Sequence, residues 1–80
     1  MTDVLALRFF TSDPLDHCAR ALDVVRRMGF ELVSVSASPA PSATFLIRVN
    51  FVPVGDRPPH ILASRISGFI GVTEVEIGAT

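Results

Sequence analysis

The sequence has a single cysteine, no lysine and no long apolar run. Cys18 stands alone, so the chain cannot form an internal disulfide. All seven basic residues are arginines and the net charge is −1, so the composition lacks the electrostatic footprint of a protein that binds nucleic acid or anionic lipid. No stretch reaches the roughly 20 apolar residues of a membrane span, and nothing resembles a signal peptide. We therefore expect a cytoplasmic protein without nucleic-acid or membrane partners.

Charged residues are also scarce. They make up 19% of the 80 residues, whereas apolar residues make up 49%. The core must be thin, because a domain near this size buries only roughly 60% of the surface that its unfolded chain exposes. We expect a single domain over residues 1–80. Exposed surface usually carries more charge than this chain offers, which suggests that a partner covers part of it.

Four strand patterns are visible, over residues 4–10, 31–37, 44–52 and 72–77, because strand-forming apolar residues recur there with period two. In the third, Phe45, Ile47, Val49 and Phe51 share one face. In the second, Val33, Val35 and Ala37 are expected to face inward, and Ser34 and Ser36 outward. Residues 38–42 and 53–59 are expected to be loops.

Two helical patterns separate these strands. The first begins at the capping residue Asp13 with Pro14 in the first turn, and Gly29 ends it in a left-handed cap. Its expected apolar face consists of Leu15, Cys18, Ala19, Leu22 and Val25. The second follows the prolines at 58 and 59, carries Leu62, Ile66 and Phe69, and is expected to end at Gly71.

The order of elements, β-α-β-β-α-β, predicts a ferredoxin-like α+β fold. Right-handed crossovers place both helices on one face of a four-stranded antiparallel sheet with the spatial order 4-1-3-2. The second strand then forms a bare edge, and Ser34 and Ser36 are too small to protect it. A bare edge on a thin domain predicts a homodimer.

No catalytic or metal-binding pattern is visible. A zinc site needs about four ligands at suitable spacing, and the only histidines are His17, expected on the solvent side of its helix, and His60. Cys18 is expected to pack in the core. Ser34 and Ser36 have no base near them in sequence that could activate them.

The sheet face away from the helices is expected to carry Ala6, Arg8, Ser34, Ser36, Leu46, Arg48 and Asn50. RNA-binding domains of this shape display aromatic and basic side chains there, and this set holds no aromatic residue. Arg8, Leu46, Arg48 and Asn50 are our candidate contacts for a partner protein, with the apolar Leu46 as the anchor. Arg8 and Asn50 could also suit an acyl-phosphate site, so a small acylphosphatase-like hydrolase remains an alternative function. However, the loop before the first helix has no glycine to cradle phosphate.

Three stretches, residues 24–30, 31–35 and 66–77, resemble the ACT domain, a small regulatory module often attached to enzymes of amino-acid metabolism. The first reads Val-Val-Arg-Arg-Met-Gly-Phe and the third contains Gly-Val before the last strand. Within that family the chain is most similar to the short regulatory subunits of acetolactate synthase (acetohydroxyacid synthase). The alternative is a stand-alone ACT module that senses an amino acid or regulates another enzyme.

The resemblance implies a non-catalytic subunit that pairs side by side and binds a large catalytic subunit in branched-chain amino-acid biosynthesis. It places thiamine diphosphate, a divalent metal and a flavin on that large subunit and no cofactor on this chain. It also implies an amino-acid effector site, where one chain contributes Asp13, Pro14, Leu15 and Asp16 and its partner contributes Glu31 and Leu32. Family members typically have asparagines and a Pro-Gly at these places, so the acidic residues here predict weak effector binding.

Overall fold

The computed structural model describes residues 3–80 and confirms the predicted order of elements. The chain runs through β1 (Leu5–Thr11), α1 (Pro14–Arg27), β2 (Glu31–Ala40), β3 (Thr44–Val52), α2 (His60–Ser67) and β4 (Val72–Ala79). All strand pairs are antiparallel, and the strands lie in the order β2-β3-β1-β4. This is the predicted 4-1-3-2 order counted from the opposite edge, so the fold is ferredoxin-like.

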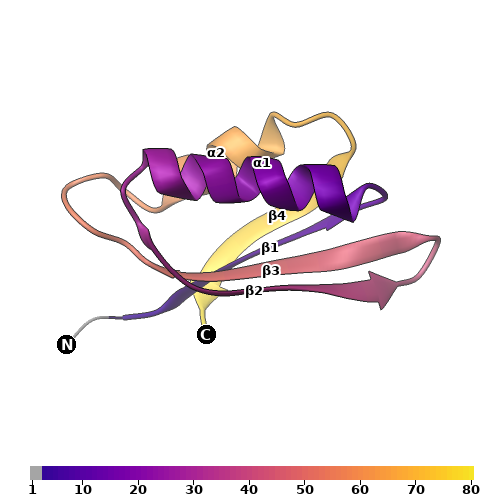
Figure 1. The fold of residues 1–80 in the computed structure, drawn as a ribbon, viewed down its shortest axis with the longest axis horizontal. Coiled ribbons are helices and arrows are strands. Elements are labelled where there is room, and N and C mark those ends of the chain that lie inside the picture. Colours follow the sequence, from indigo (N-terminus) through magenta and orange to yellow (C-terminus); the bar gives the residue numbers. More distant parts are fainter. Residues whose placement is uncertain (1–2) are drawn as a thin grey trace.

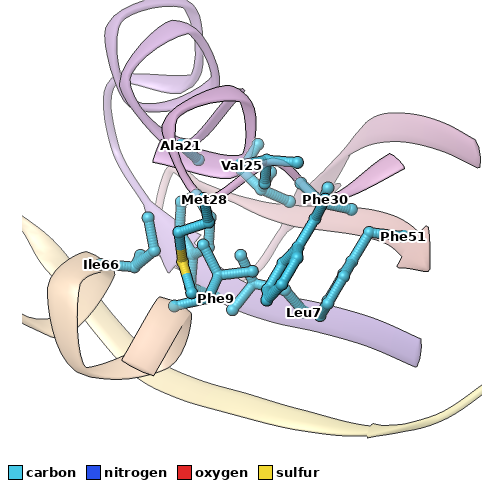
Figure 2. Close-up of a cluster of buried hydrophobic side chains, with 11 residues drawn as sticks. Leu7, Phe9, Ala21, Val25, Met28, Phe30, Phe51 and Ile66 are labelled. Atoms are coloured by element: carbon cyan, nitrogen blue, oxygen red, sulfur yellow. The ribbon is translucent and has the colours of Figure 1, made fainter. Parts of the chain in front are cut away.

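Both helices lie on the same side of the sheet (Figure 1). We call that side the covered face and the other the open face. The core fills the space between the helices and the covered face, and Figure 2 shows part of it. In this cluster the rings of Phe30 and Phe51 stack, with 5.5 Å between their centroids. Its fully buried members include Leu7, Phe9, Ile47, Val49, Leu62 and Ile66. Alternation along β1 and β3 sends every second side chain into this core.

The first helix begins as predicted but buries a different stripe. Asp13 caps it by accepting a hydrogen bond from the backbone N–H of Asp16, and Gly29 follows it in the left-handed region at φ 75°. The buried residues of α1 are His17, Ala21 and Val25, whereas Leu15 is 87% exposed. The expected apolar face was therefore misplaced by about half a turn at its start, and His17 does not face solvent.

The second strand is longer than predicted. Residues 38–40 belong to β2, and Pro39 pairs with Phe45, although residues 38–42 were expected to form a loop. A proline is tolerated there because β2 is an edge strand, whose outer side needs no ladder hydrogen bond. The turn to β3 is confined to residues 41–43, where Ser42 and Ala43 adopt positive φ.

Two further local differences change where side chains lie. Helix α2 ends at Ser67 with Gly68 as its cap, so Phe69 follows the helix and is not part of it. The pairing of β2 shifts register between Leu32 and Ser34, so that Leu32 is opposite Phe51 on the covered face and Val33 has no partner on β3. A bulge of this kind adds one residue to the edge strand.

Candidate functional site

The open face of the sheet gathers the residues predicted to contact a partner. The strand registers arrange its central side chains in three rows across β1 and β3. Phe10 lies opposite Leu46, Arg8 opposite Arg48, and Ala6 opposite Asn50. The outer strands extend these rows with small or polar residues, namely Ser38, Ser36 and Ser34 on β2 and Thr73, Glu76 and Gly78 on β4.

Phe10 on this face corrects the sequence-based expectation that the open face holds no aromatic residue. Its side chain is half-buried, as are those of Leu46, Arg8, Arg48 and Asn50. The strand pattern offered the signal that was missed, since Phe10 lies two residues beyond Arg8 and must share its face. The open face therefore has an apolar pair at one end and a pair of guanidinium groups at its centre.

The polar groups of the open face are only partly satisfied. The side-chain amide of Asn50 donates to Ser34 Oγ at 2.8 Å, but its Oδ1 is buried without a hydrogen-bond partner in the described structure, and so is Arg8 Nε. The ion pairs found within residues 3–80 all lie on α1, where Asp16 pairs with Arg20 and Asp23 pairs with Arg26 and Arg27. Neither Arg8 nor Arg48 has a carboxylate within ion-pairing distance in that part of the chain.

The edge strand β2 forms a second uncovered surface. Every residue of β2 except Ala40 is exposed. Its apolar side chains near the covered face are not packed under the helices, since Leu32 remains 50% exposed, Val33 55% and Val35 41%. Unpaired backbone groups and apolar side chains thus lie together along one edge, which is the usual profile of a surface that pairs with another strand.

The predicted effector residues form two groups that do not meet within one chain. Asp13, Pro14, Leu15 and Asp16 lie where α1 begins, next to the end of β1, whereas Glu31 and Leu32 begin β2. Thr11 pairs with Phe45 and Glu31 with Val52, and these β3 partners are seven residues apart. At about 3.3 Å per residue the two groups are separated by roughly 23 Å. The carboxylates of Asp13 and Asp16 are already engaged, by the helix cap and by Arg20.

His17 links three elements at this same end of the sheet. Its Nδ1 contacts the hydroxyl of Thr11, which also accepts a hydrogen bond from the backbone N–H of Asp13 at 2.9 Å. Its ring stacks on that of Phe69, with 6.2 Å between the ring centroids. Gly71 is close to the same ring, since a Cβ added at Gly71 would lie 3.3 Å from His17 Cε1. The sequence offered one signal of its burial, because His17, Ala21 and Val25 are spaced four residues apart and so lie on one face of the helix.

A His17→Ala substitution is expected to lower the free energy of unfolding by about 2 kcal/mol, because it leaves a cavity and removes the hydrogen-bond partner of the buried Thr11. The measurement is urea unfolding followed by circular dichroism. His60→Ala is the matched control, since His60 is exposed and its loss should change stability by less than about 0.5 kcal/mol. Equal losses for the two variants would contradict the structural role of His17.

The groove beside Phe69 does not assemble reactive groups. A hollow of about 380 Å³ is lined by Ala19, Arg20, Asp23, Val24, Arg27 and Phe69. The hydrogen bond from Arg26, aided by the charge of Arg27, lowers the pKa of Asp23, so this carboxylate remains ionised and paired. Burial raises the pKa of the Cys18 thiol, which disfavours the nucleophilic thiolate. Within residues 3–80, no three histidine, cysteine, aspartate or glutamate side chains cluster in a way that could hold a metal ion.

Neither described helix is both long and apolar enough to cross a membrane. No family model matches the sequence, and no curated protein matches it either.

The chain is similar to the C-terminal domain of the MgtC protein from Mycobacterium tuberculosis, with a TM-score of 0.85 and 17% identity over 99% of this chain and 88% of that one. It is similar to the ACT domain from the GTP pyrophosphokinase of Chlorobium tepidum, with a TM-score of 0.73 and 13% identity over 96% of this chain and 99% of that domain. A formyltetrahydrofolate deformylase from Pseudomonas putida KT2440 matches with a TM-score of 0.70 and 17% identity over 98% of this chain, which spans 29% of the deformylase. These likenesses establish that the chain has an ACT-like fold.

Proposed function

We propose that this chain is a non-catalytic regulatory domain that binds and activates the catalytic subunit of acetolactate synthase. The observation that carries the proposal is that the fold leaves both the β2 edge and the open sheet face uncovered. The sequence resemblance of residues 24–35 and 66–77 to the short regulatory subunits of that enzyme supplies the choice of partner. The ACT-like fold supports a regulatory module.

The two uncovered surfaces suit two different partners. The β2 edge suits a second copy of the chain, because two edges related by a twofold axis can extend the sheet by antiparallel pairing. Such pairing reverses one β2 relative to the other. Glu31 and Leu32 of the second copy would then lie at the end of the sheet where Asp13 and Asp16 of the first copy lie. The open face remains free to contact the catalytic subunit.

Activation by binding requires that this domain prefer the active conformation of its partner. A tenfold gain in rate needs only about 1.4 kcal/mol of such preference, which a small interface can supply. The apolar pair Phe10 and Leu46, flanked by Arg8 and Arg48, offers the contacts for it.

The test is to mix this chain with the large acetolactate synthase subunit from the same genome and to assay acetolactate formation. Co-elution of the two chains and an increased rate are expected. Absence of both would refute the assignment and favour a module that serves another enzyme or senses an amino acid. Acyl-phosphate hydrolysis by the isolated chain, lost on Arg8→Ala, would instead favour the hydrolase alternative.

Isothermal calorimetry with valine, leucine and isoleucine should detect only weak binding, with dissociation constants no tighter than the millimolar range. The reason is that Asp13, Asp16 and Glu31 would repel the carboxylate of the ligand. Arginine belongs in the same screen, since its guanidinium offsets part of that repulsion. A micromolar dissociation constant for any of the three branched-chain amino acids would show that the carboxylates do not control the site.

A further inference from the structure

The centre of the open face places two positive charges side by side. Arg8 and Arg48 are directly opposite on β1 and β3, where neighbouring side chains in antiparallel strands have Cβ atoms roughly 5 Å apart and like charges destabilise the pair. Glu76 is opposite Arg8 on β4, yet it forms no ion pair with that arginine. Within residues 3–80, neither arginine of this repulsive pair has a carboxylate at ion-pairing distance.

The surrounding atoms indicate what kind of anion would fit. Arg8 Nε is a buried donor without an acceptor, and Asn50 Oδ1 is a buried acceptor without a donor. A carboxylate can accept from the terminal N–H groups of both guanidinium groups in a fork geometry, whereas the two buried atoms are reached only if their side chains turn toward the ligand. An aspartate or glutamate of a peptide segment offers such a carboxylate.

The shape of the open face would admit such a segment. Gly78 lies beside the Arg8 guanidinium, since a Cβ on Gly78 would be 3.9 Å from Nη2. The rest of that row consists of Ala6, Asn50 and Ser34, so little side-chain bulk stands above the sheet on either side of Asn50. The half-buried Phe10 and Leu46 offer an apolar contact next to the charged row.

We propose that the open face binds an acidic segment of a partner protein, with a carboxylate between Arg8 and Arg48 and an apolar residue against Phe10 and Leu46. This deepens the proposed function, since it names the chemistry of the partner's segment, but it does not require that the partner be acetolactate synthase. A second copy of the chain is disfavoured as the occupant of the same face, because a twofold axis through the centre of that face would place one arginine pair against the other. Single-stranded RNA is disfavoured because the open face offers only one aromatic side chain, Phe10, on which a base could stack.

The experiment uses the whole chain, labelled with ¹⁵N, and two acetylated peptides. One is a glutamate-rich peptide with interspersed leucines, and its twin has glutamine at each glutamate position. The glutamate peptide should shift the Arg8 and Arg48 Nε–H and Asn50 amide signals and bind about tenfold more tightly than the twin. No synthase is present, so this result is independent of the activation assay.

Two variants make the outcome specific. Arg48→Leu should weaken binding of the glutamate peptide about tenfold and at the same time raise the urea midpoint, because it removes the like-charge pair. Arg65→Leu, on the exposed side of α2, should change neither. Equal binding of the two peptides, no binding of either at millimolar concentration, or signal shifts confined to the helices would overturn the proposal. Tighter binding of oligouridylate than of the glutamate peptide would overturn it in favour of RNA.

Discussion

A Val35→Lys variant should be monomeric at high micromolar concentrations, at which we expect the parent chain to form the proposed dimer. Val35 is central in β2 and 41% exposed on the side of the sheet that carries the helices. If two β2 edges pair around a twofold axis, the substitution introduces two ammonium groups into the same interface. The interface then lacks the apolar contact of both Val35 side chains, and each ammonium group is partly removed from water. We therefore expect the dimer dissociation constant to rise by about a hundredfold or more. Light scattering and sedimentation equilibrium measure this directly.

Ile70→Lys is the matched control for that variant. Ile70 is 96% exposed in the turn between α2 and β4, on the side of the sheet away from β2, so the same substitution should leave the dimer intact. Both variants should retain the circular dichroism spectrum of the parent. A parent chain that is strictly monomeric, or equal dissociation of the two variants, would contradict pairing through β2.

The regular strands were the most predictable part of the fold. The bounds of β3 agree with the sequence-based expectation, because Phe45, Ile47, Val49 and Phe51 alternate without interruption. The start of α1 was also predictable, since Asp13 and Pro14 act through their own backbone neighbours. Local chemistry of this kind does not depend on the rest of the chain.

Features that depend on tertiary neighbours were not predictable in the same way. Leu15 with Ala19 and His17 with Ala21 both have helical spacing, so periodicity cannot decide which pair is buried. The contacts of His17 with Thr11 and Phe69 favour burial of His17 and Ala21. The strand character of Pro39 likewise depends on knowing that β2 is an edge.

In the candidate site, too, features set by local sequence were predictable and features set by tertiary neighbours were not. Arg8, Leu46, Arg48 and Asn50 were expected to share one face, because strand alternation fixes the side of each residue, and the structure brings them together. Their row-by-row pairing required the register of β1 against β3. The effector residues could be assigned to their elements, but their separation along the strands follows from the topology. The two groups do not meet within one chain, so a shared site would require a second chain.

A Leu46→Asp variant should return the synthase rate to that of the large subunit alone. Leu46 is half-buried on the open face, paired with Phe10 and two residues from Arg48. Aspartate would remove the apolar anchor of the proposed interface and place a carboxylate beside the arginine pair, where it would compete with the acidic group proposed for the partner. The side chain faces away from the helices and off the β2 edge, so the domain should stay folded and dimeric.

The matched control replaces another exposed apolar side chain with the same residue. Val54 is 45% exposed in the loop after β3, and Val54→Asp should preserve stimulation to within about twofold. Rates are measured at saturating concentrations of each variant, with light scattering and thermal unfolding run in parallel. If Leu46→Asp stimulates as well as the parent while co-eluting with the large subunit, the contact lies elsewhere, because an aspartate at the centre of a desolvated interface costs far more than the about 1.4 kcal/mol on which a tenfold activation rests.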